Sequence, residues 1–196
     1  MKRFFDFLVA GAGLVVLAPV LAVIAFAVAA SSPGPVLFRQ QRVGLHGRPF
    51  EILKFRTMTH APEGTGPLVT AAGDRRITPV GRVLRAAKLD ELPQLWNVVR
   101  GDMSLVGPRP EVAKYVELYP PGVAEKVLSV RPGITDEASI RYRDEAGILA
   151  LAEDPERAYV EEVLPRKLEI YLRYAERHSL AGDLGILFRT IASLFR

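Results

Sequence analysis

The chain has 196 residues, enough for one domain with a single core, and 49% of them are hydrophobic, which excludes intrinsic disorder. It contains no cysteine, which excludes disulfides, zinc fingers, iron–sulfur sites and a cysteine nucleophile. The net charge is +4, and residues 31–100 hold 11 basic against 5 acidic residues. This excess predicts a surface that faces anionic headgroups, phosphate-bearing substrates or both. Nucleic acid is not an expected partner, because no recognised nucleic-acid module is visible.

The N-terminal segment contains an uncharged run of 24 residues, from Phe7 to Ala30. A bilayer is crossed by about 20 apolar residues in a helix, so a freely soluble protein is not expected. Lys2 and Arg3 together with the small residues Ala27 and Ala29 are typical of a cleavable signal peptide. The run is longer than the roughly 7 to 15 apolar residues of such a signal, which favours a retained membrane segment.

Basic residues flank this run on both sides, with Lys2 and Arg3 before it and Arg39, Arg42 and Arg48 after it. The positive-inside rule places both flanks in the cytoplasm, which only a re-entrant helix permits. Pro19, after Ala18, removes a backbone donor and can bend the helix near its middle. A tilted spanning anchor with a tolerated proline stays open. We expect residues 1–34 to form the membrane segment and residues 35–196 a cytoplasmic domain.

A β-hairpin is predicted after the turn-rich exit from the membrane. Residues 36–43 are typical of a strand, residues 44–47 of a turn, and residues 50–58 alternate as a second strand. Lys54 and Arg56 fall on one face of that second strand, so the hairpin surface is expected to be basic. Residues 60–74 are rich in Gly, Pro and Thr and are expected to form a mobile loop.

Helices are predicted for most of the remainder. Thr78 and Pro79 are typical of a helix start, and that helix is expected to end near Lys88. Apolar residues at three- and four-residue spacing predict a second helix over 89–99, with Asp90 as its N-cap and Pro93 in its first turn. Further helices are expected over 111–119, 123–130, 160–178 and 184–195. The expected fold is α+β: a re-entrant membrane helix, then a small, mainly helical domain with a β-hairpin and amphipathic interface helices.

Two adjacent carboxylates, Asp90 and Glu91, are the strongest candidates for chemistry. Helix capping is the commoner explanation of such a pair. The cationic setting favours a reactive role, because arginines can bind phosphate oxygens while a carboxylate attacks phosphorus. The same two carboxylates can supply oxygen ligands to Mg²⁺. A glycosidase fits poorly, since neighbouring residues do not readily place carboxyls on opposite sides of a sugar.

The chain resembles the small monotopic phosphoglycosyl transferases, the bacterial sugar transferase family, over nearly its whole length. The resemblance rests on five blocks in order: PVLFRQQRVG at 35–44, KFRTM at 54–58, LDELPQLWNV at 89–98, GDMSLVGPRP at 101–110 and RPGIT at 131–135. This chain differs from many members at Ala18, Lys88 and Asp136. The change at Asp136, where many members have glycine, leaves the sugar that is transferred unpredicted.

The resemblance implies transfer of a phosphosugar from a UDP-sugar to undecaprenyl (polyprenol) phosphate, with Mg²⁺, at the cytoplasmic face of the bacterial inner membrane. Asp90 resembles the nucleophile that forms a covalent phosphosugar intermediate and expels UMP, and Glu91 its partner. The expected phosphate and nucleotide contacts are Lys54, Arg56, Arg85, Pro108, Arg109, Pro110, Arg131, Arg141 and Arg143. The alternative function is a non-catalytic membrane scaffold whose basic face binds anionic lipid.

Overall fold

The computed structural model describes residues 1–59 and 73–193. Its first half contains α1 (Lys2–Ser31), β1 (Leu37–Val43), η1 (Leu45–Gly47), β2 (Pro49–Phe55), α2 (Pro79–Ala86), η2 (Leu89–Glu91), α3 (Gln94–Arg100) and β3 (Ser104–Val106). Its second half contains α4 (Ala113–Val116), α5 (Val123–Val127), β4 (Gly133–Thr135), α6 (Glu137–Arg141), α7 (Glu145–Ala150), α8 (Pro155–Ala158), η3 (Tyr159–Val163), α9 (Leu164–Arg177) and α10 (Leu180–Ser193). The predicted mobile loop falls almost entirely on residues 60–72, outside the described residues.

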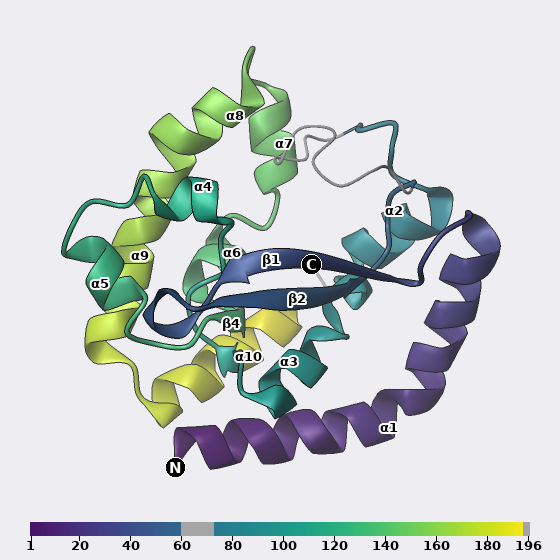
Figure 1. Ribbon diagram of the computed structural model, residues 1–196, viewed down its shortest axis with the longest axis horizontal. Coiled ribbons are helices and arrows are strands. Elements are labelled where there is room, and N and C mark those ends of the chain that lie inside the picture. Colours follow the sequence, from purple (N-terminus) through teal and green to yellow (C-terminus); the bar gives the residue numbers. More distant parts are fainter. Residues whose placement is uncertain (60–72, 194–196) are drawn as a thin grey trace.

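Helix α1 is one continuous helix of 30 residues with Pro19 inside it. It follows the lower edge of the molecule and then turns upward along its right side, so the helix is bent rather than straight (Figure 1). Only four of its residues are buried, Asp6 and Ala10 near its start and Ile24 and Val28 near its end. The predicted apolar helix is therefore present, and it touches the rest of the protein at two separate patches.

The predicted hairpin is confirmed. β1 pairs antiparallel with β2 in continuous register from Leu37 opposite Phe55 to Val43 opposite Pro49. The turn uses His46 in the left-handed region, at φ 54°. β2 ends at Phe55. Arg56 therefore lies beyond the strand and leaves the alternation that was expected to continue through it.

The two helices predicted around the acidic pair are present, although their junction differs. Thr78 caps α2 as expected, its side chain accepting a hydrogen bond from the backbone N–H of Gly81 at 2.9 Å. The prediction that Asp90 is an N-cap is wrong: Lys88 precedes η2 in the left-handed region, and Pro93 precedes α3. Asp90 lies inside a 3₁₀ turn, where the backbone is already helical and a capping geometry is not available.

A two-stranded parallel sheet of β3 and β4, which the sequence did not predict, joins the middle of the chain to its second half. Ser104 pairs with Gly133, and Val106 with Thr135. A Cβ atom on Gly133 would lie 2.1 Å from the backbone nitrogen of Gly107. The two segments therefore approach closely only because this position carries no side chain.

The second half of the chain is helical, as expected, and forms its own core. Tyr115 of α4, Val127 of α5 and Tyr171 of α9 belong to one buried cluster. A second cluster joins Ala10 of α1 to α3 and β3, and a third joins Ile24 and Val28 of α1 to α2 and β2. α9 and α5 stand beside each other at the left of the molecule, with the hairpin in front of the centre and α1 along two edges (Figure 1). The predicted mixed fold with a hairpin and a long apolar N-terminal helix is confirmed.

Candidate active site

The acidic pair lies on η2, a single turn that connects α2 to α3. Asp90 is 7% exposed, and Glu91 lies beneath the hairpin, where Lys54 of β2 reaches it. This turn contacts both α2 and β2. The structure thus places the two candidate carboxylates on a turn that packs against both the hairpin and α2.

Glu91 is held by two cations. Its Oε1 accepts hydrogen bonds from Lys54 Nζ at 2.7 Å and from Arg109 Nη2 at 2.6 Å, and Arg109 Nη1 lies 3.5 Å from Oε2. Burial by itself raises the pKa of Glu91, but the charges and hydrogen bonds of Arg109 and Lys54 outweigh it and hold the pKa well below its usual range. Glu91 is therefore a permanent anion that fixes both cations.

Asp90 has a different environment. Burial raises the pKa of its carboxyl group, the neighbouring Glu91 charge acts in the same direction, and Lys54 and Arg85 oppose it. Its Oδ1 is buried and has no hydrogen-bond partner among the described residues. Asp90 thus offers an oxygen with free lone pairs beside cations that another carboxylate already orients, which suits a nucleophile.

The cations of the site are affected by the same burial. Burial lowers the pKa of Lys54 to about 8, although Glu91 acts to raise it. The charge of Glu91 raises the pKa of Arg109 well above its usual value. Arg85 donates from Nε to Thr57 Oγ1 at 3.0 Å, and burial lowers its pKa although Asp90 acts to raise it. Lys54 and Arg109 thus contact the dyad, and the charge of Arg85 acts on Asp90, while the phosphate contacts of all three stay predictions.

A second layer of polar groups supports the loop that carries Arg109. Arg42 donates to the carbonyl of Pro110 at 3.1 Å and lies 3.6 Å from Glu111 Oε2. Glu111 also accepts a hydrogen bond from the hydroxyl of Tyr159. Pro108 is buried, and its carbonyl accepts from the backbone N–H of Gly133 at 3.0 Å. Pro108 and Pro110 thus frame Arg109 through backbone contacts, and a nucleotide contact of these prolines stays a prediction.

Arg56 lies in a place that the phosphate hypothesis did not anticipate. Arg56 is 5% exposed, and its guanidinium donates to the carbonyls of Val28 at 3.2 Å and Ser32 at 2.5 Å, and also to that of Pro35. These carbonyls belong to the end of α1 and to the segment after it. In this conformation the donors of Arg56 serve the end of α1, and a phosphate contact stays a prediction.

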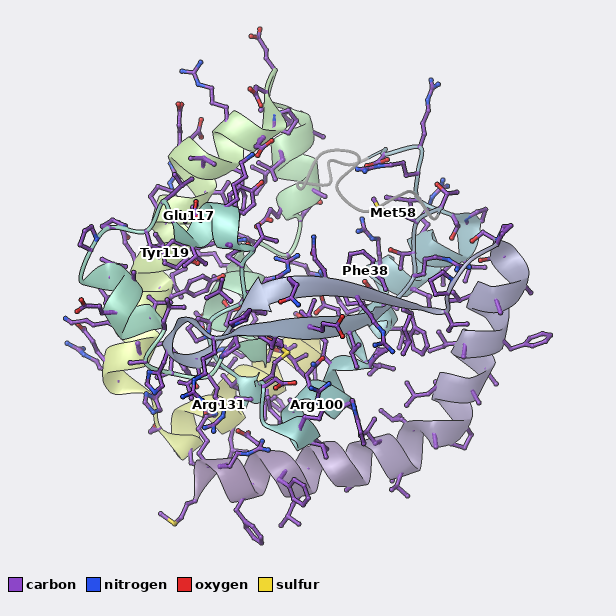
Figure 2. All side chains as sticks on the ribbon, in the orientation of Figure 1. Phe38, Met58, Arg100, Glu117, Tyr119 and Arg131 are labelled. Atoms are coloured by element: carbon purple, nitrogen blue, oxygen red, sulfur yellow. The ribbon has the colours of Figure 1, made fainter. Side chains whose placement is uncertain are left out.

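The three remaining arginines lie on other parts of the fold. Arg131 donates from Nε to the carbonyl of Gly101 at 3.0 Å. Phe38 is the strand partner of Lys54, which contacts the dyad, and Figure 2 shows Arg131 well apart from Phe38. Arg141 is exposed at the end of α6, and Arg143 is exposed and donates to the carbonyl of Ser193 in α10. The structure does not bring these side chains to the dyad, and their roles stay predictions.

Asn97 is a site residue that the sequence hypothesis missed. Its side chain accepts from the backbone N–H of Leu53 at 3.0 Å and donates to the carbonyl of Glu51 at 2.7 Å, so it fixes α3 to the free edge of β2. Glu91, Gln94 and Asn97 recur every three residues, a spacing that could have indicated one polar face toward β2. Gln94 is 1% exposed on this stretch. The ion pair of Arg42 with Glu111 joins residues far apart in the chain, and no spacing in the sequence indicates it.

Comparison with known proteins identifies the family. The model that describes bacterial sugar transferases matches residues 1–196. The chain belongs to the bacterial sugar transferase family. The chain is 42% identical over 195 residues to a UDP-glucose:undecaprenyl-phosphate glucose-1-phosphate transferase of Caulobacter vibrioides, covering 98% of this chain and 69% of that protein.

Two further relatives are much longer than this chain. A transferase of the same name from Escherichia coli is 38% identical over 97% of this chain and 39% of its own length. A UDP-N-acetylgalactosamine-undecaprenyl-phosphate N-acetylgalactosaminephosphotransferase of Aeromonas hydrophila is 37% identical over 99% of this chain and 43% of its own length. The chain thus spans about two fifths of these two proteins. Their names contain different sugars.

Proposed function

We propose that this bacterial sugar transferase moves a sugar phosphate from a UDP-sugar to undecaprenyl phosphate and releases UMP. One observation carries the proposal: two adjacent carboxylates have different environments. Asp90 has a buried oxygen without a hydrogen-bond partner among the described residues, and Glu91 is held by Lys54 and Arg109. The names of the relatives, which describe phosphotransferases that act on undecaprenyl phosphate, support the same reaction class. Their different sugars give no reason to choose one sugar for this chain.

The proposed chemistry has two displacement steps. In the first, an oxygen of Asp90 attacks the phosphorus that bears the sugar, and the bond from that phosphorus to the bridging oxygen breaks, so UMP leaves with the electron pair. In the second, an oxygen of the lipid phosphate attacks the same phosphorus, and the bond to Asp90 breaks. The carboxylate is regenerated, and the product is a lipid diphosphate sugar. Lys54, Arg85 and Arg109 offset the repulsion between the anions.

Magnesium is proposed as the cofactor. Glu91 Oε2 has only a long contact with Arg109 and so has lone pairs to give, and Asp90 could give the oxygen that does not attack phosphorus. Residues 1–59 and 73–193 contain no group of three or more acidic or histidine side chains placed for a metal. Two carboxylates fit Mg²⁺, which commonly takes its other ligands from water and substrate phosphate. Bound there, it would neutralise charge on the diphosphate.

We also propose that α1 enters the bilayer and returns, which leaves the catalytic body on one side, the cytoplasmic face. Its most apolar 18-residue window has a mean hydropathy of 2.7 and is 11% buried. At its start, Arg3 donates to the carbonyls of Val98 and Val99 at 2.5 and 3.0 Å, and at its end Arg56 holds the carbonyl of Val28. Both ends of α1 are therefore tied to one body, whereas a spanning helix separates its ends by about 30 Å of hydrocarbon.

UMP release tests the reaction. The full chain in nanodiscs, given UDP-sugars, Mg²⁺ and undecaprenyl phosphate, should release UMP, and Asp90→Asn should abolish release. Asp154→Asn is the matched control, because Asp154 is an exposed N-cap of α8 and asparagine caps equally well. Full activity of the Asp90→Asn protein would disprove the nucleophile. Liposome binding without turnover of any UDP-sugar would instead favour a lipid-binding scaffold.

Cysteine labelling tests the topology. The chain contains no cysteine, so one cysteine inserted after Met1 and one at Pro35→Cys can be labelled without background. Both should react from the same side of the membrane. Labelling from opposite sides would refute the re-entrant arrangement.

A further inference from the structure

One face of the hairpin covers the candidate active site. Phe38 lies opposite Lys54 in the strand register, and Arg42 lies opposite Phe50. Directly opposed residues of antiparallel strands point to the same face, and residues two apart share it. Lys54 reaches Glu91 from this face, and Arg42 reaches the carbonyl of Pro110. Phe38 therefore shares the face that looks onto the dyad.

Phe38 is the exposed apolar member of this face. Phe38 is 43% exposed, whereas Ile52 on the same face is 2% exposed. Figure 2 shows Phe38 toward the α2 end of the hairpin, near Met58. The side chains of Phe38 and Lys54 have Cβ atoms about 5 Å apart, as in any directly opposed pair. An accessible aromatic side chain thus lies directly across the two strands from the lysine whose ammonium group contacts the dyad.

The same ring lies near the point where the chain leaves α1. Leu37 and Val36 pack with Ile24 and Val28 of α1. Pro35, whose carbonyl Arg56 holds, is three residues before Phe38, so at most about 10 Å of strand separates them. Phe38 is therefore placed between the exit of the apolar helix and the dyad.

We propose that Phe38 binds the first isoprene units of the lipid acceptor while Lys54 and its neighbours bind the acceptor phosphate. The proposal rests on the proposed function. An acceptor that joins an anionic phosphate to an apolar chain needs a cation and an apolar surface side by side, as Lys54 and Phe38 provide. The ring could instead stack on the uracil of the donor. Its place close to the end of α1 favours the lipid, because the acceptor must reach the dyad from the membrane.

The two half-reactions separate these ligands, because the first requires only the UDP-sugar. Phe38→Ala should leave single-turnover UMP release without acceptor within twofold of the wild-type rate. It should raise the KM for a polyprenyl phosphate about tenfold or more, as expected for the loss of apolar surface that the bound isoprene units would cover. Phe38→Leu should retain most of the acceptor affinity, since an isoprene unit needs apolar contact and not an aromatic plane. Phe188→Ala, which removes a 74% exposed ring from α10, should not change the ratio of the two half-reactions.

Several outcomes would overturn the proposal. An unchanged KM for polyprenyl phosphate in Phe38→Ala refutes it. Slower UMP release without acceptor, not restored by Phe38→Leu but restored by Phe38→Tyr, assigns the ring to the nucleobase. If Phe38→Ala does not fold, Phe38→Gln, which is compatible with an exposed strand, provides the same comparison. A wild-type protein that releases no UMP refutes the proposed function itself, which is a distinguishable result.

Discussion

The ammonium group of Lys54 should set the alkaline limit of the reaction. Its pKa is about 8 in the free protein, because burial outweighs the attraction of Glu91. About 90% of the molecules then carry the charge at pH 7, about 10% at pH 9, and tenfold fewer for each further pH unit. The charged form is the one that can bind a phosphate, so activity should be present below pH 8 and be lost as the pH rises through that value. In Lys54→Arg the side chain stays charged at every pH of interest.

The assay is kcat/KM for the UDP-sugar, measured by UMP release between pH 5.5 and pH 10, since this quantity reports groups of the free enzyme. The wild type should lose about fivefold between pH 8 and pH 9 and about tenfold between pH 9 and pH 10, whereas Lys54→Arg should show no decline there, whatever its maximum. Lys126→Arg, on an exposed ion pair with Glu176, is the control and should follow the wild type. If Lys54→Arg keeps the wild-type alkaline limb, another group causes it and the reasoning is wrong.

Three further predictions concern groups around this site. Glu91→Gln should move the alkaline limb to lower pH, because Glu91 acts to raise the pKa of Lys54; a limb that stays in place, in the pH profile of kcat/KM, contradicts this. Gly81→Ala should lower the free energy of unfolding by about 2 to 4 kcal/mol, because the new Cβ would lie 2.0 Å from the carbonyl oxygen of Thr57. Gly11→Ala, with open space around it, should be neutral or stabilising by up to about 1 kcal/mol, and equal denaturation midpoints for these two variants would rule out the steric explanation. Arg56→Lys should lower stability by about 1 to 3 kcal/mol, since one ammonium cannot replace a fork that serves three carbonyls, while the exposed Arg157→Lys should not; thermal denaturation measures both.

The elements that the sequence predicts well are those with local signals. The hairpin follows from alternation around a turn, and the start of α2 from Thr78 and Pro79. The β3–β4 pair consists of two three-residue strands about 30 positions apart, and no local pattern specifies such a pairing. The N-cap prediction failed at Asp90 for a related reason. An acidic residue before a helix is typical both of a cap and of a 3₁₀ turn, and the tertiary contacts of η2 decide between them.

The site was predicted in its charges and less well in its contacts. Lys54 and Arg56 are two residues apart and equally basic in the sequence, yet β2 ends between them. Lys54 stays on the face toward the dyad, while Arg56 turns to the carbonyls at the end of α1. Charge pattern alone does not distinguish an arginine that binds a ligand from one that binds backbone oxygens. That distinction depends on where a strand stops.

The basic residues before the apolar run also hold the start of α1 against the rest of the protein, which the positive-inside rule does not predict. Lys2 pairs with Asp183 of α10, and Arg3 donates to Val98 and Val99 in the last turn of α3. The dyad turn η2 leads directly into α3, which has seven residues and is therefore about 10 Å long. One end of this short helix is bonded to α1 and its other end adjoins Asp90 and Glu91. The short helix α3 thus fixes the distance between the dyad and the apolar helix. A fixed distance is what the proposed reaction would require, because a soluble donor and a membrane-bound acceptor must reach the same reaction centre.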